Sequence, residues 1–493
     1  MSFDPRQPVL IGIGTCSQRE ENFALAVEPM DLMLQAVRSA GHDAGGDAGS
    51  VEILRGVQHI AVPKGRWHYR DPAGEIARAV GAESATTVLA SVGVLQQSLI
   101  GEACRRIAAG EIDLALVAGA DTGYRILRAK LADERAAERQ QHSAPHISLA
   151  PTEELLHPAE LQAGIRMPVA LYAIIESAFR ASKGWSVSEH RQQLGRMYKQ
   201  FSVVAAANPQ AWRRKVLQAA DISEASERNP MQAFPYTSSH CANWNVDQAA
   251  ALLLCSAGRA RALGIPSSAW VYASASTESN HMVPVSARLD PAHCEGAAVA
   301  GKAALSAAGL SASQLDLVEL YSCFPVAVET CAEALGIALT RDLTVTGGMS
   351  FAGGPFNNYV LQATCRMAQL IREGRGKTGL VSSVSGILTK QGFGVWSSHP
   401  NSEGFVFADV SAEVEKRTQT KEVAASFNGN AVVAGYTVLQ HKGKAPRALV
   451  LADTEAACRA LAWSEDAALV ERMQAAEFCG VAIAMQDGVF TVT

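Results

Sequence analysis

Tyr321 and Cys323 are two side chains of this 493-residue chain that could carry out chemistry. They follow residues 316–320, a short apolar segment that predicts a strand, so they stand at a strand end. A tyrosine hydroxyl can donate a hydrogen bond to an enolate or alkoxide oxygen, or act as general acid or base. A thiol can act as a nucleophile. The alternative for both is packing, with Cys323 under the loop and Tyr321 filling space.

His240 is a candidate base in the segment SSHCANWNVD. The alternative is a loop histidine that bonds only to the backbone. Asp247, at the end of the same segment, is expected to cap or anchor the loop before a helix over residues 248–254.

A glycine-rich turn, Gly353-Gly354-Pro355, is followed by Asn358 and Tyr359 at the start of a predicted helix. Backbone N–H groups at a helix start can bind an oxyanion, a phosphate or a carbonyl oxygen. The alternative is that the glycines only permit a tight turn.

The elements that must position these residues occur in two copies of similar order. Two units in which helices alternate with short apolar strands predict a duplicated α/β fold, with sheets covered on both faces. In the first copy, helices are expected over 31–40, 74–80 and 97–108, and strands over 58–62, 86–91 and 113–118. In the second, helices are expected over 301–308, 326–335 and 359–372, and strands over 316–320, 344–350 and 378–384.

The chain is too long for one core, which predicts several domains. A mostly polar, helical insertion over about 122–231 separates the copies, and such insertions often form part of a ligand site. After about residue 410, short alternating segments predict a small barrel of the OB type. The expected domains are 1–265, 266–409 and 410–493.

Composition excludes several classes of partner. The net charge is −5 with no basic block, which argues against nucleic acid and anionic membranes as partners. No apolar run reaches the roughly 18–20 residues of a membrane span, and the start of the chain has no signal-peptide pattern. Ten scattered cysteines without a CxxC pair predict free thiols in a reducing cytoplasm, with neither a disulfide framework nor a metal site.

Four segments, in this order, resemble the thiolase superfamily, and in particular the SCP2-type, thiolase-like branch with an extra C-terminal domain. The resemblance implies a five-layer αβαβα core with the active site between its halves, and a coenzyme A thioester as substrate or ligand without a covalently bound cofactor. It also implies self-association, with a homodimer among the expected forms. The segments are PYTSSHCANWNVDQAAALLLCS (235–256), DLVELYSCFPVAVETCAEALG (316–336), GGMSFAGGPFNNYV (347–360) and GILTKQGFGVWSS (386–398).

The resemblance also locates the catalytic positions, and none holds the standard residue. A thiolase needs a cysteine at a helix start, where the helix dipole favours the thiolate; the matching residue is Gly93. Gly354 stands in place of the catalytic histidine, and Val384 or Ser385 in place of the second cysteine. Tyr321 matches the asparagine that positions a water. The sequence therefore argues against acetyl-CoA acetyltransferase activity by the thiolase route, although the resemblance would assign it.

Residues that would meet the ligand also follow from the resemblance. Asn243 matches a small polar residue that contacts the pantetheine arm, and His240 lies where the thioester arm is expected. Lys390 and Gln391 are near the expected site as well.

Two hypotheses remain open. The first is an enzyme that makes or breaks a C–C bond of an acyl-CoA, as a retro-aldolase does, without a cysteine nucleophile. Thiolase-like aldolases of steroid side-chain breakdown work with a small OB-fold partner, and here such a domain is predicted as a fused part. Tyr321, with His240 or Tyr359, would transfer protons, and the Gly354 turn would hold the thioester oxygen.

The second hypothesis is a non-catalytic acyl-CoA or lipid binding protein, or a scaffold. An intact polar pocket with tyrosine donors would favour the enzyme. A pocket filled by Trp244 or Phe356 would favour the binding protein.

Overall fold

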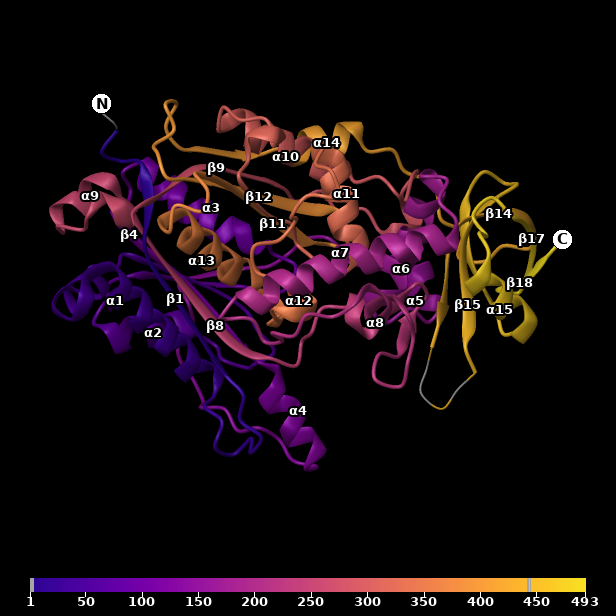
Figure 1. The fold of residues 1–493 in the computed structure, drawn as a ribbon, viewed down its shortest axis with the longest axis horizontal. Coiled ribbons are helices and arrows are strands. Elements are labelled where there is room, and N and C mark those ends of the chain that lie inside the picture. The colour runs from indigo at the N-terminus through magenta and orange to yellow at the C-terminus, as the bar shows by residue number, and fades with distance from the viewer. Residues whose placement is uncertain (1–3, 441–442, 444) are drawn as a thin grey trace.

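The fold consists of two β-sheets with helices packed on them, seen in a computed structural model that describes residues 4–440, 443 and 445–493. One sheet has eleven strands and crosses the body of the molecule, whereas the other has seven and forms most of the C-terminal end, drawn in yellow in Figure 1. None of the helices in these described ranges has the length and apolar character that crossing a membrane requires.

The large sheet confirms the predicted duplication, because its halves share one strand order. The first half runs β3-β2-β4-β8-β1 and the second β10-β11-β12-β9. In this order β10, β11, β12 and β9 correspond to β2, β4, β8 and β1, and β3 has no counterpart. The halves meet where β1 pairs with β9. The strands are β1 (Pro8–Gln18), β2 (His59–Pro63), β3 (Thr86–Ala90), β4 (Leu114–Thr122), β8 (Asp247–Ser256), β9 (Val271–Ser279), β10 (Leu317–Glu319), β11 (Thr378–Ser385) and β12 (Lys390–Ser397).

The helices follow the same duplication. Helix α3 contacts β4 of its own half and β9 of the other, and α13 contacts β11 and β8, so these two helices form the layer between the halves (Figure 1). The paired helices are α1 (Pro29–Arg55) with α10 (Glu295–Ala307), α2 (Pro72–Val80) with α11 (Pro325–Leu335), and α3 (Gln96–Ala108) with α13 (Tyr359–Arg372). The first helix does not end at Gly41 as its C-cap suggested, but continues through a kink at Gly46.

The strand predicted over 344–350 is wrong. The backbone N–H groups of Val345 and Thr346 donate to the buried carboxylate of Glu319, at 2.8 and 2.9 Å, and the Thr344 hydroxyl donates to the same oxygen. Because a side chain takes these N–H groups, they form no strand ladder, and a short helix, α12 (Gly348–Phe351), follows.

The helix predicted over 248–254 is also wrong, because this segment is part of strand β8. All ten residues of β8 are buried, and a fully buried apolar run gives no periodicity that separates a strand from a helix. Asp247 does cap a helix, but a different one. Its Oδ1 accepts the N–H groups of Tyr124 and Arg125 at the start of α4 (Gly123–Leu131).

The insertion lies between the duplicated core and the C-terminal end (Figure 1). Its helices, α6 and α7, are long, and its strand β5 pairs with β3 at the edge of the large sheet. Its elements are α5 (Pro158–Gln162), α6 (Pro168–Ser182), α7 (Val187–Ala207), α8 (Ala219–Ser223), β5 (Ile147–Leu149), β6 (Met231–Ala233) and β7 (Tyr236–Thr237). Helix α9 (Ala257–Ala262) connects β8 to β9 at the end of the molecule far from the barrel (Figure 1), whereas β13 (Val406–Asp409), which pairs with β9, and α14 (Ser411–Arg417) precede the barrel in the chain.

The C-terminal strands close into the predicted five-stranded barrel. The pairing order is β14-β15-β16-β18-β17 and back to β14, with helix α15 between β16 and β17, as in an OB fold. The domain boundaries at 265 and 409 stay a prediction. The elements are β14 (Gly429–Leu439), β15 (Arg447–Thr454), β16 (Arg459–Ser464), α15 (Ala467–Ala475), β17 (Ala482–Gln486) and β18 (Val489–Val492).

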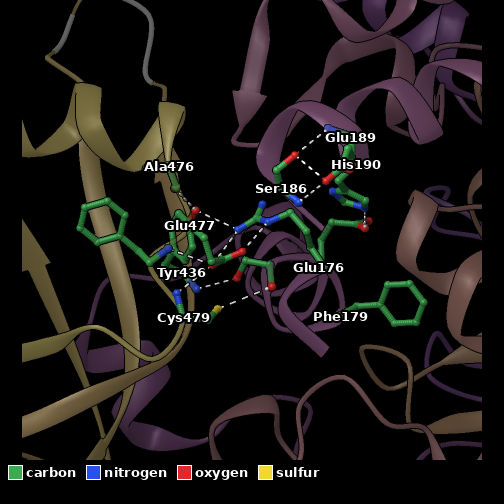
Figure 2. A network of polar contacts seen from close by, with 12 residues as sticks. Glu176, Phe179, Ser186, Glu189, His190, Tyr436, Ala476, Glu477 and Cys479 are labelled. Carbon is green, nitrogen blue, oxygen red and sulfur yellow. Dashed lines mark hydrogen bonds and ion pairs between the residues drawn. The ribbon is translucent and has the colours of Figure 1, made fainter. Parts of the chain in front are cut away.

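A buried arginine joins the barrel to the insertion. Arg180 of α6 is fully buried and donates to the Glu477 carboxylate and the Tyr436 hydroxyl, each at 2.8 Å. Tyr436 also donates its backbone N–H to Ser177 of α6 at 2.7 Å. Figure 2 shows Tyr436 and Glu477 of the C-terminal part facing the insertion helices.

We predict that Arg180→Met lowers the free energy of unfolding by about 3 kcal/mol, because it leaves the half-buried Glu477 carboxylate without its cation. Urea unfolding measures this loss. The matched control is Arg417→Met, which removes an ion pair with Glu413 that is more than half exposed on both sides and should change stability by less than about 0.5 kcal/mol. Equal effects of the two variants would contradict the conclusion that Arg180 joins the barrel to the insertion.

Candidate functional site

A cavity of about 270 Å³ lies where loops of both halves meet the insertion. Its walls come from the loop before α3, the loop after β10, the turn before α13 and the loop between β11 and β12. Gly93, Gly354, Val384 and Ser385, the positions matched to thiolase catalytic residues, all line this cavity. The expected reacting loops therefore converge in space, and they do so without a cysteine or histidine at these positions.

Tyr321, Cys323 and Gly354 are the predicted site residues that line the cavity. Trp244 and Phe356 line it too, and their rings meet edge to face at 6.4 Å. They form part of the wall without filling the space. The filled pocket that would have favoured the non-catalytic binding protein is thus not observed.

The Tyr321 hydroxyl is the main polar feature of this wall. Burial raises the pKa of Tyr321, which keeps the phenol protonated, while a hydrogen bond with Gln96 acts in the opposite direction. Its backbone N–H donates to the Ser382 hydroxyl at 2.8 Å, and its ring packs edge to face on Tyr359 at 5.7 Å. The side chain is therefore fixed and is available as a hydrogen-bond donor.

Cys323 shares the cavity wall but is not an activated thiol. Burial raises the pKa of Cys323 to about 12, although hydrogen bonds with Tyr172 and with the backbone of Phe324 and Cys323 act in the opposite direction. An activated cysteine needs positive charge or a helix N-terminus to stabilise its thiolate. Cys323 lies two residues before α11, but this position does not outweigh the burial, so Cys323 is a neutral thiol near pH 7.

His240 lies outside the cavity lining and is only 1% exposed. Its Nδ1 meets the Thr237 hydroxyl at 3.1 Å, and its ring packs edge to face on Tyr198. Burial lowers the pKa of His240 to about 3, so the imidazole is neutral near pH 7. The structure gives this predicted base no route to a ligand in the cavity.

Tyr359 is also turned away from the cavity. Its hydroxyl donates to Glu319 Oε1 at 2.5 Å and lies 2.7 Å from the Thr346 hydroxyl. Its neighbour Asn358 is 2% exposed, and Gly353 packs against Gln248, where an added Cβ would lie 2.3 Å from a side-chain oxygen. These three predicted binding residues therefore hold the turn in place and do not face the cavity.

The turn does not offer the Gly354 amide as a free donor. That N–H donates to the carbonyl of Asn243 at 3.0 Å, so Asn243 holds the turn and does not line the cavity. Asn357 lines the cavity, but its Nδ2 group is buried and has no hydrogen-bond partner among the described residues.

Lys390, which the resemblance placed near the expected site, lines the cavity, as do Gln96 and Tyr172, which the sequence did not single out. The Lys390 amine donates to the carbonyl of Gly93 at 2.9 Å, and burial lowers the pKa of Lys390. Its position beside Gln391 was noticed in the sequence, but the fold was needed to bring it opposite Gly93.

Backbone strain gathers at the cavity. Phe356 and Ile387 both line it and have positive φ angles of 46° and 48°. For a β-branched residue such as isoleucine this conformation is rare and costs about 1–3 kcal/mol. A hydrogen bond from the buried Arg288 guanidinium to the Ile387 carbonyl, at 2.5 Å, helps to hold it.

A larger cavity, of about 410 Å³, runs along α13 and includes Tyr359, Arg366 and Arg372. It contains none of the loops matched to the catalytic positions. The smaller cavity is therefore the candidate active site.

No protein-family model matches the chain, and no curated protein matches it in sequence. Among solved structures it is similar to a monomeric SCP2-thiolase-like protein type 1 from Mycobacterium smegmatis, with 25% identity, a TM-score of 0.82 and coverage of 100% of both chains. It is also similar to the Ltp2-ChsH2(DUF35) aldolase, with 17% identity, a TM-score of 0.60 and coverage of 80% of this chain and 99% of the other.

The dimeric peroxisomal thiolase of Saccharomyces cerevisiae is a further match. It shares 16% identity with a TM-score of 0.56, over 81% of this chain and 99% of its own. These matches confirm the predicted thiolase fold. The match that extends over the whole chain includes the C-terminal barrel.

We predict that Cys323 reacts with iodoacetamide at pH 7.5 at least about a hundredfold more slowly than free cysteine, because its raised pKa leaves little thiolate. Its rate should keep rising as the pH approaches 12. Peptide mapping by mass spectrometry, with Cys323→Ala to assign the peptide, measures the rate. Fast alkylation at pH 7.5 would show an activated thiol and contradict this reading.

Proposed function

We propose, from the premise that the duplicated core of this chain has the thiolase fold, that its 270 Å³ cavity binds the acyl end of a coenzyme A thioester. We further propose aldol-type making or breaking of a C–C bond, with Tyr321 in place of the cysteine and histidine chemistry of thiolases. The observation that carries the proposal is an open cavity at the convergent loops, with a tyrosine hydroxyl and a lysine amine on its wall.

The proposed reaction is the cleavage of a 3-hydroxyacyl thioester. A base removes the hydroxyl proton, the Cα–Cβ bond breaks, and its electron pair becomes the thioester enolate. The proton then returns to Cα, which gives an aldehyde or ketone and a shortened acyl-CoA. Such a route needs a hydrogen-bond donor for the enolate oxygen and a base of suitable pKa, but no nucleophile.

Tyr321 and Lys390 suit these two roles. The protonated Tyr321 hydroxyl would donate to the thioester oxygen, where negative charge develops. Lys390, whose pKa burial lowers, would accept the hydroxyl proton as a neutral amine. His240 and Tyr359 take no part in this version of the mechanism.

The similarity to an aldolase supports this choice of reaction. The matched protein is named an aldolase of Ltp2 with ChsH2(DUF35), and at 17% identity its likeness to this chain concerns the fold. The barrel at residues 410–493 would stand here as a fused counterpart of a separate OB-fold partner.

A second candidate is a protein that binds an acyl-CoA without converting it. Burial raises the pKa of both Tyr321 and Cys323, so neither supplies a base or a nucleophile near pH 7. The proposed reaction would then depend on Lys390 as its base. We place either function in a reducing compartment such as the cytoplasm, because all the described cysteines are free thiols.

We predict that the wild-type protein binds a 3-hydroxyacyl-CoA in a calorimetric titration and releases a shortened acyl-CoA, detected by mass spectrometry. Tyr321→Phe should lower turnover by about 10²–10³-fold, as the loss of an oxyanion donor does. Its affinity should fall by less than about tenfold. Tyr124→Phe is the control, because its hydroxyl bonds Glu21 at an exposed site and should leave turnover unchanged.

Binding without any product would favour the second candidate. The absence of binding to coenzyme A, acetyl-CoA and the 3-hydroxyacyl-CoA would contradict both.

We also predict a monomer, and not the homodimer that the resemblance implied. Strand β5 pairs with β3 and covers that edge of the large sheet, where a second copy could otherwise add a strand. The Mycobacterium smegmatis relative is described as monomeric. Size-exclusion chromatography with light scattering should give 52.1 kDa; twice that mass would contradict the prediction.

A further inference from the structure

Three titratable side chains meet in a buried cluster that the proposed function does not use. Glu176 of α6, His190 of α7 and Glu329 of α11 each offer one ligand atom, and these atoms lie within 4.8 Å of one another. Glu176 and Glu329 are fully buried, and His190 is 1% exposed. Figure 2 shows Glu176 and His190 turned toward each other between the insertion helices.

The donor atoms of the cluster pair with one another. His190 Nε2 lies 2.8 Å from Glu176 Oε1 and 3.7 Å from Glu329 Oε2. Outside the cluster, Glu176 Oε1 and both oxygens of Glu329 have no hydrogen-bond partner among the described residues. Two carboxylates buried side by side repel each other unless a proton or a cation lies between them, so a bound cation would neutralise them.

The surroundings orient the donors as they do around bound metal ions. The Tyr236 hydroxyl donates to Glu176 Oε2 at 2.5 Å, which leaves Oε1 for the centre of the cluster. Trp185 stacks on the His190 ring at 5.8 Å, and Ser186 caps the start of α7 one turn before it. Such outer partners fix the ligands of metal sites.

We propose that Glu176, His190 and Glu329 bind one divalent transition-metal ion, with zinc the best match to the donor set. Imidazole and carboxylate ligands suit zinc, at about 2.0–2.2 Å from the metal, so the donors of a tetrahedral site lie roughly 3.3–3.6 Å apart. On binding, the pair at 2.8 Å would therefore open, and any pair near the 4.8 Å limit would close. Two carboxylates and a neutral imidazole balance the charge of the ion.

The ion would link the insertion to the second half of the core by binding side chains of both. Helices α6 and α7 belong to the insertion and α11 to the second half. Tyr172 of α6 and Phe324, just before α11, stack at 4.6 Å and both line the 270 Å³ cavity. The metal would therefore be structural and would stabilise one wall of that cavity.

The test uses the full chain, stripped with a chelator and titrated with zinc and with cobalt(II). We expect one ion per chain and a rise in melting temperature with zinc that the chelator reverses. Glu329→Gln keeps the shape of the side chain but should weaken zinc binding at least about tenfold. The matched control is Glu278→Gln, a buried carboxyl outside the cluster, which should bind zinc as the wild type does.

X-ray absorption of the zinc-loaded wild type gives a result that needs no variant. The proposal expects nitrogen and oxygen neighbours, with one imidazole and no sulfur. Sulfur neighbours would place zinc on the free cysteines and overturn the proposal. So would the absence of stoichiometric binding, which would leave a shared proton to hold the cluster, or equal zinc affinity in Glu329→Gln and the wild type.

Discussion

The buried guanidinium of Arg288 is the interaction on which the arrangement of the cavity and the barrel depends. It donates to the carbonyl of Val283 at 3.1 Å and to that of Ile387 at 2.5 Å. Burial lowers the pKa of Arg288 to about 10, so it is still a cation near pH 7, and backbone carbonyls solvate its charge. From the barrel, Arg459 donates to the carbonyl of Arg288 at 2.5 Å and to that of Leu289 at 3.2 Å. One short segment thus holds the strained cavity loop on one side and the barrel on the other. This link explains why the C-terminal domain, although distant in sequence, bears on the shape of the candidate site.

Much of the fold could be predicted because its signals are local. The predicted helix over 359–372 has the bounds of α13, since its apolar face lies within the segment and Gly374 follows two residues after it. The failures had non-local causes. Residues 344–346 bond to the carboxylate of Glu319, which lies 25 or more positions away, and no local pattern contains that information. Strand β8 is buried on both faces between β1 and β4, which removes the alternation that would have identified it.

The candidate site could be predicted only in part, for a similar reason. The position of Tyr321 and Cys323 after an apolar strand was enough to bring them to the cavity. For His240 and Tyr359 the residue type suggested chemistry, but orientation decided otherwise. Tyr359 points to Glu319, and His240 packs on Tyr198. Lys390 entered the site because β12 folds back beside β11, which places its amine against Gly93. A sequence records which side chains are present, whereas the fold determines which of them share a space.

The central claim is that the acyl end of a coenzyme A thioester occupies the 270 Å³ cavity with its carbonyl oxygen at Tyr321. A crystal structure of the protein with a non-cleavable acyl-CoA analogue tests it most directly. The account predicts the thioester oxygen within about 3.2 Å of the Tyr321 hydroxyl, with the acyl chain between Trp244 and Phe324. An analogue bound in the larger cavity along α13, or one whose carbonyl faces away from Tyr321, would contradict it.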